Sequence, residues 1–282
     1  MNRVLLRFPN FKAKAFTLSY DDGVRQDKRL VSIMKRYNIK GTFNINSGRF
    51  SDEYAGEEKG HMTIDEALEL YKCDNCEVAV HGVEHLSLAE SPTELAVYDI
   101  ISDRLNLENI FGGIIKGMAY ANGSLSDDVV NILKCCGINY SRTTLSTESF
   151  IIPENWLKLN PTCHHDNPRI FDLAKTFIET DYTNAYFWGR KPLLFYVWGH
   201  SYEFDNNNNW ERIEKLLEYV SNKDDVWYAT NGEIYNYVKA YDSLIFSVDG
   251  KTITNPTSTD VYLSYIGNIN VLVPKGETIT IK

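Results

Sequence analysis

Short apolar runs alternate with longer amphipathic runs along the first 242 residues of the chain. Within 25–38, for example, Leu30, Ile33 and Met34 recur at the spacing of one helix face. The runs between such segments are short and apolar, and turn residues bound them. The alternation predicts strands at 15–20, 41–46, 77–82, 116–123, 138–144, 191–200 and 225–232, and helices at 25–38, 63–72, 91–110, 126–137, 209–221 and 233–242.

Repeated strand–helix units of this kind predict an α/β fold with a parallel sheet and outer helices. The run LLFYVW at 193–198 is continuously apolar, as expected for a strand buried on both faces. No glycine-rich phosphate-binding turn follows the first strand, which favours a distorted (β/α) barrel of about seven parallel strands over a doubly wound sheet. The segment 145–190 is the least regular, with one helix expected near 170–180.

The pattern changes beyond residue 242. The sequence there alternates with period two, contains turn signals at Asp249-Gly250 and Lys275-Gly276, and has no helical stretch. We therefore expect a barrel domain at 1–242 and a small antiparallel β appendage at 243–282. The appendage is expected to pack on the barrel, and sugar binding is the alternative role.

Composition narrows the class of protein. The 282 residues include 29 basic and 38 acidic side chains, a formal charge of -9, which disfavours nucleic acid as a partner. The sequence contains no run of about 18 apolar residues, so we expect no membrane-spanning helix. The five cysteines are odd in number and two are adjacent, which suits free thiols in a cytoplasmic protein better than disulfides. No signal peptide is recognisable, although a removed leader stays open, and the oligomeric state is left unpredicted.

Reactive side chains follow the carboxyl ends of several predicted strands. Asp21 and Asp22 end the first, His81 and His85 follow the third, and His200 ends a later one. Each has an ordinary explanation, because Asp-Gly is a common turn and an H-x-x-x-H spacing puts two rings on one helix face by coincidence as well as for a metal. In a barrel, however, all these ends meet on one rim. That shared rim favours a metal site.

The residue types suit a catalytic centre. Two imidazoles and one carboxylate leave coordination positions open on a divalent ion. Such an ion lowers the pKa of a water molecule to roughly 7. A second, unliganded carboxylate can then take a proton from water, and a histidine across the site can give one to a leaving group. These parts suit hydrolysis of an amide or an ester.

Four segments resemble the motifs of the polysaccharide deacetylases of the NodB-homology type, carbohydrate esterase family 4. LSYDDG at 18–23 is similar to the first motif, T-F-D-D-G, and HGVEH at 81–85 to the second, H-[ST]-x-x-H. GMAYANG at 117–123 lies where the third, R-x-P-Y, is expected, and FYVWGHSYEF at 195–204 resembles the last. The resemblance covers roughly residues 13–242 and implies the same distorted (β/α) barrel.

The resemblance also implies roles for single residues. It makes Asp21 the catalytic base and makes Asp22, His81 and His85 the ligands of a divalent metal. Zinc is the first expectation, and Co, Ni or Fe suit the same ligands.

On the other side of the site, the resemblance makes His200 the general acid and gives the backbone N–H of Tyr120 to the oxyanion. Two positions depart from the family pattern. Gly82 replaces the small hydroxyl residue, and Gly117 replaces an arginine that orients the catalytic aspartate. We expect Arg142, at the end of a later strand, to supply the missing guanidinium. The alternative is an ordinary surface arginine.

Further residues of the sequence are candidates for other roles. His164 and His165 are candidates for an extra ligand or a substrate contact, and Cys73–Cys76 is expected to be a turn at the opposite end of the barrel. Four aromatic residues are candidate platforms for sugar rings, although packing is the commoner role: Trp188, Trp198, Tyr202 and Trp210.

Three functions remain open from sequence. The favoured one is a metal-dependent hydrolase that removes N- or O-acetyl groups from a carbohydrate, its partner being that acetylated substrate. The second is a hydrolase of small amides or ureides on the same fold. The third is a catalytically silent carbohydrate-binding protein.

Overall fold

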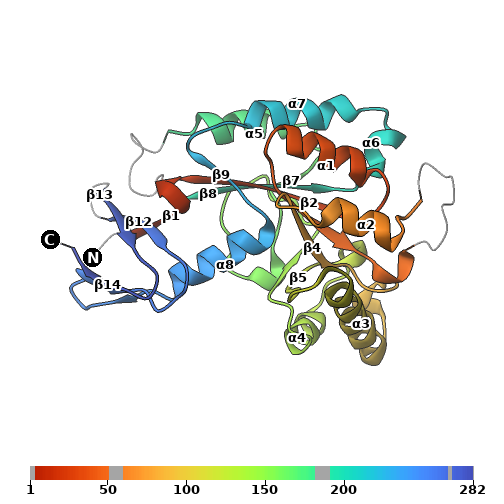
Figure 1. Ribbon diagram of the computed structural model, residues 1–282, viewed down its shortest axis with the longest axis horizontal. Coiled ribbons are helices and arrows are strands. Elements are labelled where there is room, and N and C mark those ends of the chain that lie inside the picture. The colour runs from red at the N-terminus through yellow and green to blue at the C-terminus, as the bar shows by residue number, and fades with distance from the viewer. Residues whose placement is uncertain (1–3, 51–59, 182–190, 266–268, 282) are drawn as a thin grey trace.

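A curved, largely parallel sheet forms the centre of the molecule. The computed structural model describes residues 4–50, 60–181, 191–265 and 269–281, and Figure 1 shows the sheet flanked by helices on both sides. The eight strands of this sheet are β2 (Lys14–Asp21), β3 (Gly41–Ile45), β4 (Cys76–Val80), β5 (Gly117–Ala119), β6 (Tyr140–Arg142), β7 (Cys163–His164), β8 (Leu193–Gly199) and β9 (Val226–Tyr228). They run in the order β6-β5-β4-β3-β2-β8-β7, and β9 also pairs with β2.

One connecting segment spans the gap between the two ends of this sheet. Leu159 forms a parallel bridge with Arg142 of β6, and a few residues later β7 pairs with β8. The backbone N–H of Leu159 donates to Ser141 O at 3.0 Å, while that of Thr162 donates to Tyr196 O at 2.9 Å. The segment therefore links β6 to β8 by hydrogen bonds, and the sheet has the form of a distorted (β/α) barrel.

Strand β2 is the centre of the barrel, and all eight of its residues are buried. It pairs in parallel with β8 along seven residues, with β3 near its carboxyl end, and with β9 near its amino end. The strand therefore has partners on both edges, and its last residue, Asp21, lies at the carboxyl rim beside Asn44 of β3.

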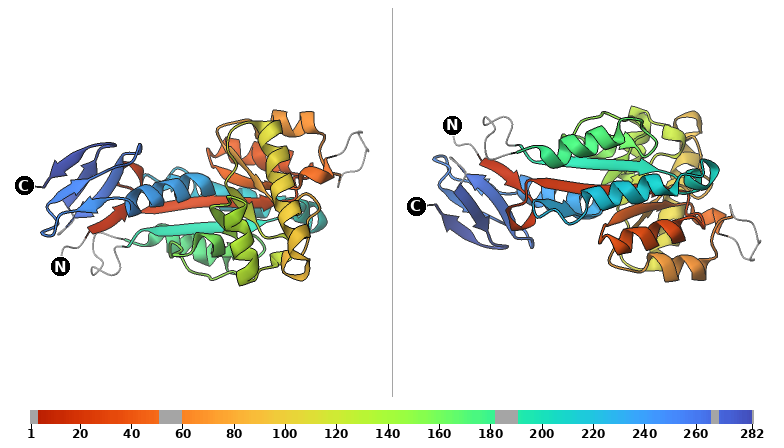
Figure 2. Two further views of the ribbon diagram at one scale, coloured as in Figure 1. Left: turned by 90° about the horizontal axis from the view of Figure 1, so that it is seen from below. Right: turned by 90° about the horizontal axis from the view of Figure 1, so that it is seen from above.

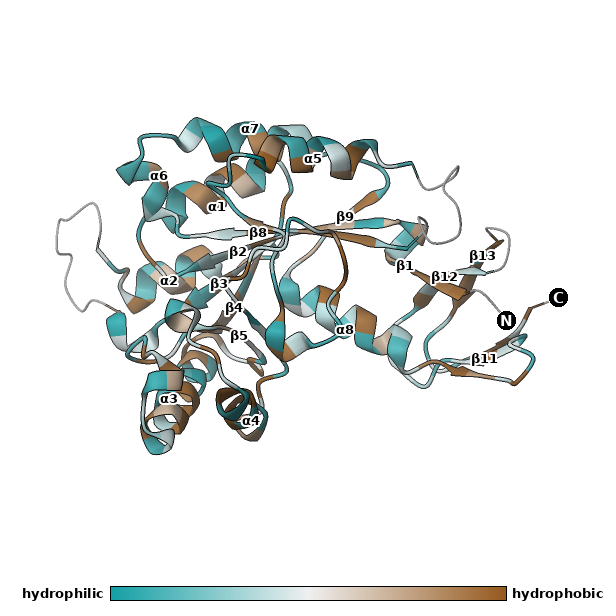
Figure 3. Cartoon of the chain, turned by 180° about the vertical axis from the view of Figure 1, so that it is seen from behind, coloured by the Kyte–Doolittle hydropathy of each residue, from teal (hydrophilic) through white to brown (hydrophobic). Residues whose placement is uncertain are grey.

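Eight helices surround the sheet in the described residues. They are α1 (Asp27–Arg36), α2 (Ile64–Tyr71), α3 (Thr93–Phe111), α4 (Asp127–Cys135), α5 (Ile170–Glu179), α6 (Tyr202–Asn206), α7 (Trp210–Val220) and α8 (Asn231–Asp242). Helices α1, α5 and α7 lie on one side of the sheet, and α3 and α4 on the other (Figure 1). Brown hydrophobic segments run along the central strands, whereas the helices carry teal and brown stretches (Figure 3). The apolar core lies between these layers.

Two small antiparallel sheets complete the fold at one end, next to both termini (Figure 2). One pairs β1 (Val4–Arg7) with β12 (Val261–Tyr265) and β13 (Ile269–Val273). The other pairs β10 (Ile245–Phe246), β11 (Thr252–Thr254) and β14 (Thr278–Thr280). The Tyr237 hydroxyl of α8 donates to Arg7 O at 2.7 Å and accepts from Tyr262 N at 3.0 Å, so the appendage is joined to the barrel.

The predicted fold class is confirmed, with three additions. The sequence did not indicate β7, which is only two residues long, or α6, a five-residue helix in a polar segment. It also did not indicate that β1 belongs to the C-terminal sheet, because that pairing joins residues about 260 positions apart. The division of the chain at residue 242 stays a prediction. No helix in the described part of the chain is long and apolar enough to cross a membrane.

Candidate metal centre and catalytic site

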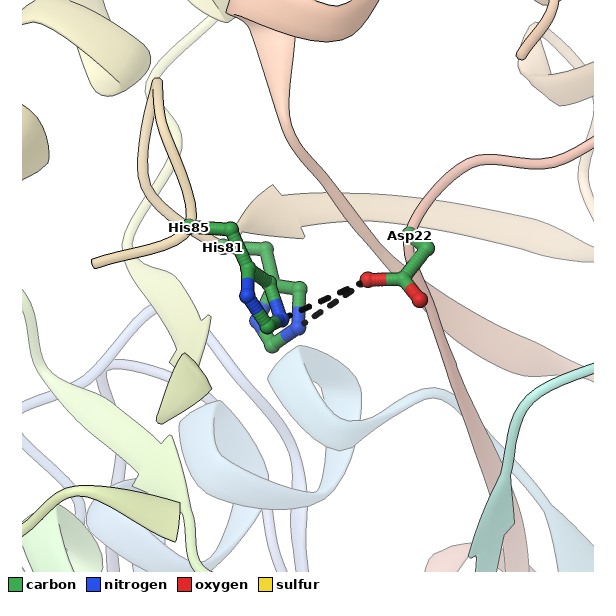
Figure 4. Close-up of side chains that lie close together, drawn as sticks. All are labelled: Asp22, His81 and His85. Atoms are coloured by element: carbon green, nitrogen blue, oxygen red, sulfur yellow. Dashed lines mark ion pairs between the residues drawn. The ribbon is translucent and has the colours of Figure 1, made fainter. Parts of the chain in front are cut away.

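Three side chains that follow the carboxyl ends of two barrel strands, β2 and β4, point at one another. Oδ1 of Asp22 lies 3.6 Å from Nε2 of His81 and 3.5 Å from Nε2 of His85 (Figure 4). The two imidazole rings meet edge to face, with centroids 4.8 Å apart. Bonds of ~2.0–2.2 Å from a tetrahedral ion place neighbouring ligand atoms roughly 3.3–3.5 Å apart. Both distances from Oδ1 of Asp22 are therefore close to that spacing, and one ligand atom from each of the three residues lies within 4.8 Å of the other two.

The protonation states of the two imidazole rings also suit the binding of a metal ion. Nδ1 of His81 lies 2.9 Å from Ala119 O, an atom that only accepts, so this nitrogen carries the proton and Nε2 presents its lone pair. Burial and the neighbouring His81 lower the pKa of His85 to about 4, so its ring is neutral at pH 7. Oδ1 of Asp22 is buried and has no hydrogen-bond partner among the described residues. The donor set thus fits a divalent ion, whose identity the donors alone do not select.

The backbone at Asp22 separates the two neighbouring carboxylates. Asp22 has φ +78°, a left-handed conformation that a residue with a Cβ seldom adopts. Its N–H donates to Asn44 O at 2.9 Å, which extends the pairing with β3 by one residue. The turn sends Asp22 to the imidazoles while Asp21 points into the barrel.

Asp21 is held by a different set of groups. Asn44 Nδ2 donates to its Oδ1 at 2.8 Å, and the Arg142 guanidinium donates to its Oδ2. Arg142 is completely buried and lies 4.2 Å over the ring of Trp198. Burial alone would raise the pKa of Asp21, but Arg142 and the nearby histidines outweigh it, and the net pKa lies below the ordinary value. Asp21 is therefore ionised at neutral pH. Arg142 and Asp21 thus form a buried ion pair, and the orienting role of Arg142 stays a prediction.

His200 faces Asp21 from the end of β8. Its Nε2 lies 3.9 Å from Oδ2 of Asp21, and Nε2 of His81 lies at the same distance from that oxygen. On the other side of the His200 ring, Nδ1 lies 3.4 Å from Oε1 of Glu203 in α6. Burial lowers the pKa of His200, but Glu203 and the two aspartates outweigh this effect, and the net pKa lies above the ordinary value. His200 is thus suited to carry a proton.

Known proteins resemble this chain in sequence and in fold. A family model described as polysaccharide deacetylase matches residues 9–141. A solved structure from Mycobacterium smegmatis, assigned to the polysaccharide deacetylases, covers 84% of this chain and 94% of its own at 15% identity, with a TM-score of 0.58. The resemblance to the polysaccharide deacetylase family is confirmed. At this identity the solved structure supports the fold alone.

Two further solved structures are similar at lower TM-scores. A Streptococcus pyogenes deacetylase in complex with acetate has 20% identity and a TM-score of 0.46, covering 50% of this chain and 61% of its own. A carbohydrate esterase family 4 pseudoenzyme from Bacillus anthracis has 16% identity and a TM-score of 0.48, covering 82% of this chain and 68% of its own. The chain thus spans less than two thirds of the first of these deacetylases. No curated protein matches the chain.

The first departure from the deacetylase motifs has a structural cause at Gly82. The segment after β4 is an irregular loop, so the expectation that His81 and His85 share a helix face is wrong. The loop turns at Gly82, with φ +86°. A Cβ there would lie 2.1 Å from Oδ2 of Asp99 in α3, so the carboxylate fills the space that a hydroxyl side chain would need.

A second acid of α3 holds the same loop. Oδ2 of Asp103 accepts the backbone N–H groups of His81 and Gly82, each at 2.9 Å, and its Oδ1 accepts Ser47 N at 2.7 Å. Asp99 accepts Glu84 N at 2.7 Å. The loop N–H groups thus donate to carboxylates of α3, and these hydrogen bonds fix the loop in place of the backbone hydrogen bonds of a helix.

The second departure, at Gly117, is explained in the same way. A Cβ at this position would lie 2.2 Å from the Tyr140 hydroxyl, so no arginine side chain fits there. Arg142, on the neighbouring strand β6, supplies the guanidinium instead.

One expected role disagrees with the geometry. The backbone N–H of Tyr120 donates to Arg142 O at 3.0 Å, and the Tyr120 hydroxyl donates to Leu157 O at 2.7 Å. Because β5 and β6 pair here, the N–H is already occupied. We therefore assign no oxyanion role to the Tyr120 N–H.

Several residues of the site were not indicated by the sequence. Asn44, Asp99, Asp103 and Glu203 lie outside the recognised motifs or in their flanks, and only the fold brings them to the rim. Asp103 is one of the acids among them, and burial raises the pKa of its carboxyl to about 7. A charged residue on the buried face of a predicted helix was the available signal.

The remaining candidates lie elsewhere or are packed. His164 and His165 contact Glu203 and do not join Asp22, His81 and His85. Trp198 and Trp210 are buried, and Tyr202 is partly exposed beside His200. Trp188 lies outside the described residues. Residues 73–75 form a turn, as expected, and Cys76 begins β4 at the amino end of the barrel.

We predict that Gly82→Ala lowers zinc affinity by roughly 10–100-fold, the usual cost of disturbing groups that support metal ligands. The added Cβ meets Asp99 and displaces the loop that carries both histidines. Zinc affinity is measured by competition with a chromophoric chelator.

Gly113→Ala is the matched control, because Gly113 also has positive φ, at +78°, but has no atom near its Cβ position. This variant should lose only about 1 kcal/mol of stability and keep its zinc affinity. Equal zinc affinity in both variants would contradict the role assigned to Asp99 and Gly82.

Proposed function

We propose that the protein is a metal-dependent hydrolase that removes acetyl groups from an acetylated carbohydrate. The observation that carries this proposal is the separation of the paired carboxylates: Asp22 faces two imidazoles, while Asp21 is held ionised by Arg142. The family resemblance supports the reaction class. The substrate, the ion and the residue roles are our assignments.

Asp22, His81 and His85 would hold the ion. When bound, the ion polarises the acetyl carbonyl and lowers the pKa of water to roughly 7. The backbone N–H of Tyr120 would not contribute to holding the oxyanion, because it already donates to Arg142 O.

The side chains move the protons. Asp21 accepts a proton from the water that attacks the acetyl carbon, and Arg142 and Asn44 keep its carboxylate oriented. His200 gives its Nε2 proton to the departing nitrogen or oxygen as the bond to the acetyl carbon breaks. The products are acetate and a free amine or alcohol. Glu203 faces Nδ1 of His200 and so fixes which nitrogen points at the substrate.

The ion pair between Asp21 and Arg142 also bears on the two alternative functions, the small-amide hydrolase and the silent binding protein. The missing motif arginine was one reason to consider a small-amide or ureide hydrolase, the other being the irregular segment 145–190. Arg142 supplies the guanidinium from another strand, which removes the first reason. A silent binding protein would have no need for an oriented base and acid on either side of a metal site. Acetylated carbohydrate therefore stays the favoured substrate.

The proposal predicts acetate release from acetylated oligosaccharides that chelators abolish. Asp21→Asn should keep one zinc per chain and lose roughly 10²–10⁴-fold in kcat, because an amide cannot act as the base. Zinc content by elemental analysis and acetate by coupled assay check both parts. Glycan binding without acetate release from the zinc-loaded wild type would instead favour the silent binding protein.

Arg142→Met should reduce both turnover and stability. Removing one partner of a buried ion pair leaves the Asp21 carboxylate uncompensated, at a cost of about 3–5 kcal/mol. Denaturant unfolding measures the stability, and the conservative Arg142→Lys should retain more of it because the charge remains. If Arg142→Met turned over substrate at the wild-type rate, its orienting role would be abandoned.

The pKa directions predict the pH profile of kcat/KM. Protonation of Asp21 should inactivate the enzyme only below its ordinary pKa of 3.8, and deprotonation of His200 only above its ordinary pKa of 6.5. Glu203→Gln removes an anion that stabilises the imidazolium, so its alkaline limb should move to lower pH. An alkaline limb that stays in place in Glu203→Gln would show that His200 is not the titrating acid.

A further inference from the structure

Glu203 is surrounded by three imidazoles. Its Oε2 lies 3.1 Å from Nε2 of His164 and 3.2 Å from Nε2 of His165, and its Oε1 lies 3.4 Å from Nδ1 of His200. Oε2 also accepts the backbone N–H of His200 at 3.1 Å. Two of these histidines come from the segment around β7 that links β6 to β8.

The protonation of His164 shows what kind of cluster this is. The spacing of His164, His200 and Glu203 alone would also suit an ion. However, Asp166 N donates to Nδ1 of His164 at 3.2 Å, so that nitrogen has the lone pair and Nε2 carries the proton. This is the opposite of His81, whose Nε2 is free to bind a metal. His164 therefore presents a donor to Glu203 and not a ligand to a cation.

His165 is fixed more firmly than a surface histidine. Its side chain is 1% exposed, and its ring stacks against Phe204, at 4.2 Å, and against Tyr20, at 5.7 Å. A Cβ on Gly199 would lie 2.1 Å from its Nδ1, so the ring packs directly against the residue before His200. Oε2 of Glu203 lies 3.2 Å from its Nε2, and Oδ1 of Asp166 lies 3.7 Å from the same nitrogen. Nε2 thus faces two carboxylates, which can only accept a hydrogen bond when ionised.

We propose that His164 and His165 are positioning residues that hold the Glu203 carboxylate against Nδ1 of His200 and thereby fix the direction in which His200 presents Nε2. Glu203 lies in the first turn of α6, a helix of only five residues, which gives its side chain little support of its own. Burial raises the pKa of Glu203, but His164, His165 and His200 outweigh it, and the net pKa is lowered. The carboxylate thus stays an acceptor for His200.

The catalytic consequence rests on the proposed function and depends on the leaving group. An amide nitrogen must receive a proton before the bond to the acetyl carbon breaks, whereas a 4-nitrophenolate leaves without one. Misplacing His200 should therefore slow the hydrolysis of an N-acetyl substrate much more than that of 4-nitrophenyl acetate. A merely structural role would slow both reactions equally.

The experiment compares His164→Phe, His164→Gln and His165→Phe with wild type, all loaded with zinc. Phenylalanine keeps the ring contacts with Trp198 or with Tyr20 and Phe204 but removes the donor. We expect the ratio of N-acetyl to 4-nitrophenyl acetate turnover to fall at least ~10-fold in both phenylalanine variants. His164→Gln, whose amide donates again, should recover part of the ratio.

Arg169→Ala is the control, because Arg169 is exposed on the same segment and pairs with Glu148. It should leave the ratio unchanged. Parallel loss of both activities, or an unchanged ratio in the phenylalanine variants, overturns the proposal. If His165→Phe fails to fold, the His164 pair still decides.

A second readout does not depend on turnover. In ¹⁵N-histidine NMR spectra, the wild-type His200 ring should show Nδ1 protonated and hydrogen-bonded, and His164→Phe should lose this fixed state. An unchanged His200 signal in His164→Phe overturns the proposal. A changed signal in a wild-type protein that releases no acetate would support the positioning role while refuting the proposed function.

Discussion

Two adjacent carboxylates at the end of a buried strand must each find positive charge or a hydrogen-bond donor, and the site is organised around that requirement. The left-handed turn at Asp22 separates them, so one meets a guanidinium and an amide while the other meets two imidazole lone pairs. Lone pairs do not neutralise a carboxylate. A cation between Asp22 and its two histidines would balance the charge of this carboxylate.

The groups that support this arrangement come from the edges of the barrel. On one side, Asp99 and Asp103 of α3 hold the backbone of the histidine loop. On the other, Glu203 of α6 faces His200, and Ser201 beside it donates to Asp27 of α1 at 2.5 Å. Helices on opposite sides of the sheet thus fix the two halves of the site, and β2 lies between them (Figure 1). The side chains of the candidate site are thus held in place by parts of the chain far from them in sequence.

The sequence predicted the fold well because the βα periodicity is local information. Strands such as 193–198 are apolar throughout, and the helices have clear apolar faces, so each element is recognisable by itself. The rim location of Asp21, His81 and His200 followed from strand order alone. Arg142 was expected beside Asp21 because a buried carboxylate needs a partner and the motif arginine was missing.

What could not be predicted depends on contacts between distant segments. Gly82 and Gly117 appeared as losses from the family motifs, and only the positions of Asp99 and Tyr140 show that a side chain has no room there. The Tyr120 N–H seemed available until β5 and β6 were seen to pair. The His164 tautomer depends on one backbone N–H, which no sequence pattern reports.

One ion should bind to Asp22, His81 and His85 while Asp21 stays unliganded. Anomalous diffraction from zinc-loaded crystals would locate this ion. We expect a single strong peak within ~2.0–2.2 Å of Nε2 of both histidines and of one oxygen of Asp22, with Arg142 still on Asp21. A peak bonded to Asp21, a peak at His164 and Glu203 in its place, or no peak at all would contradict it.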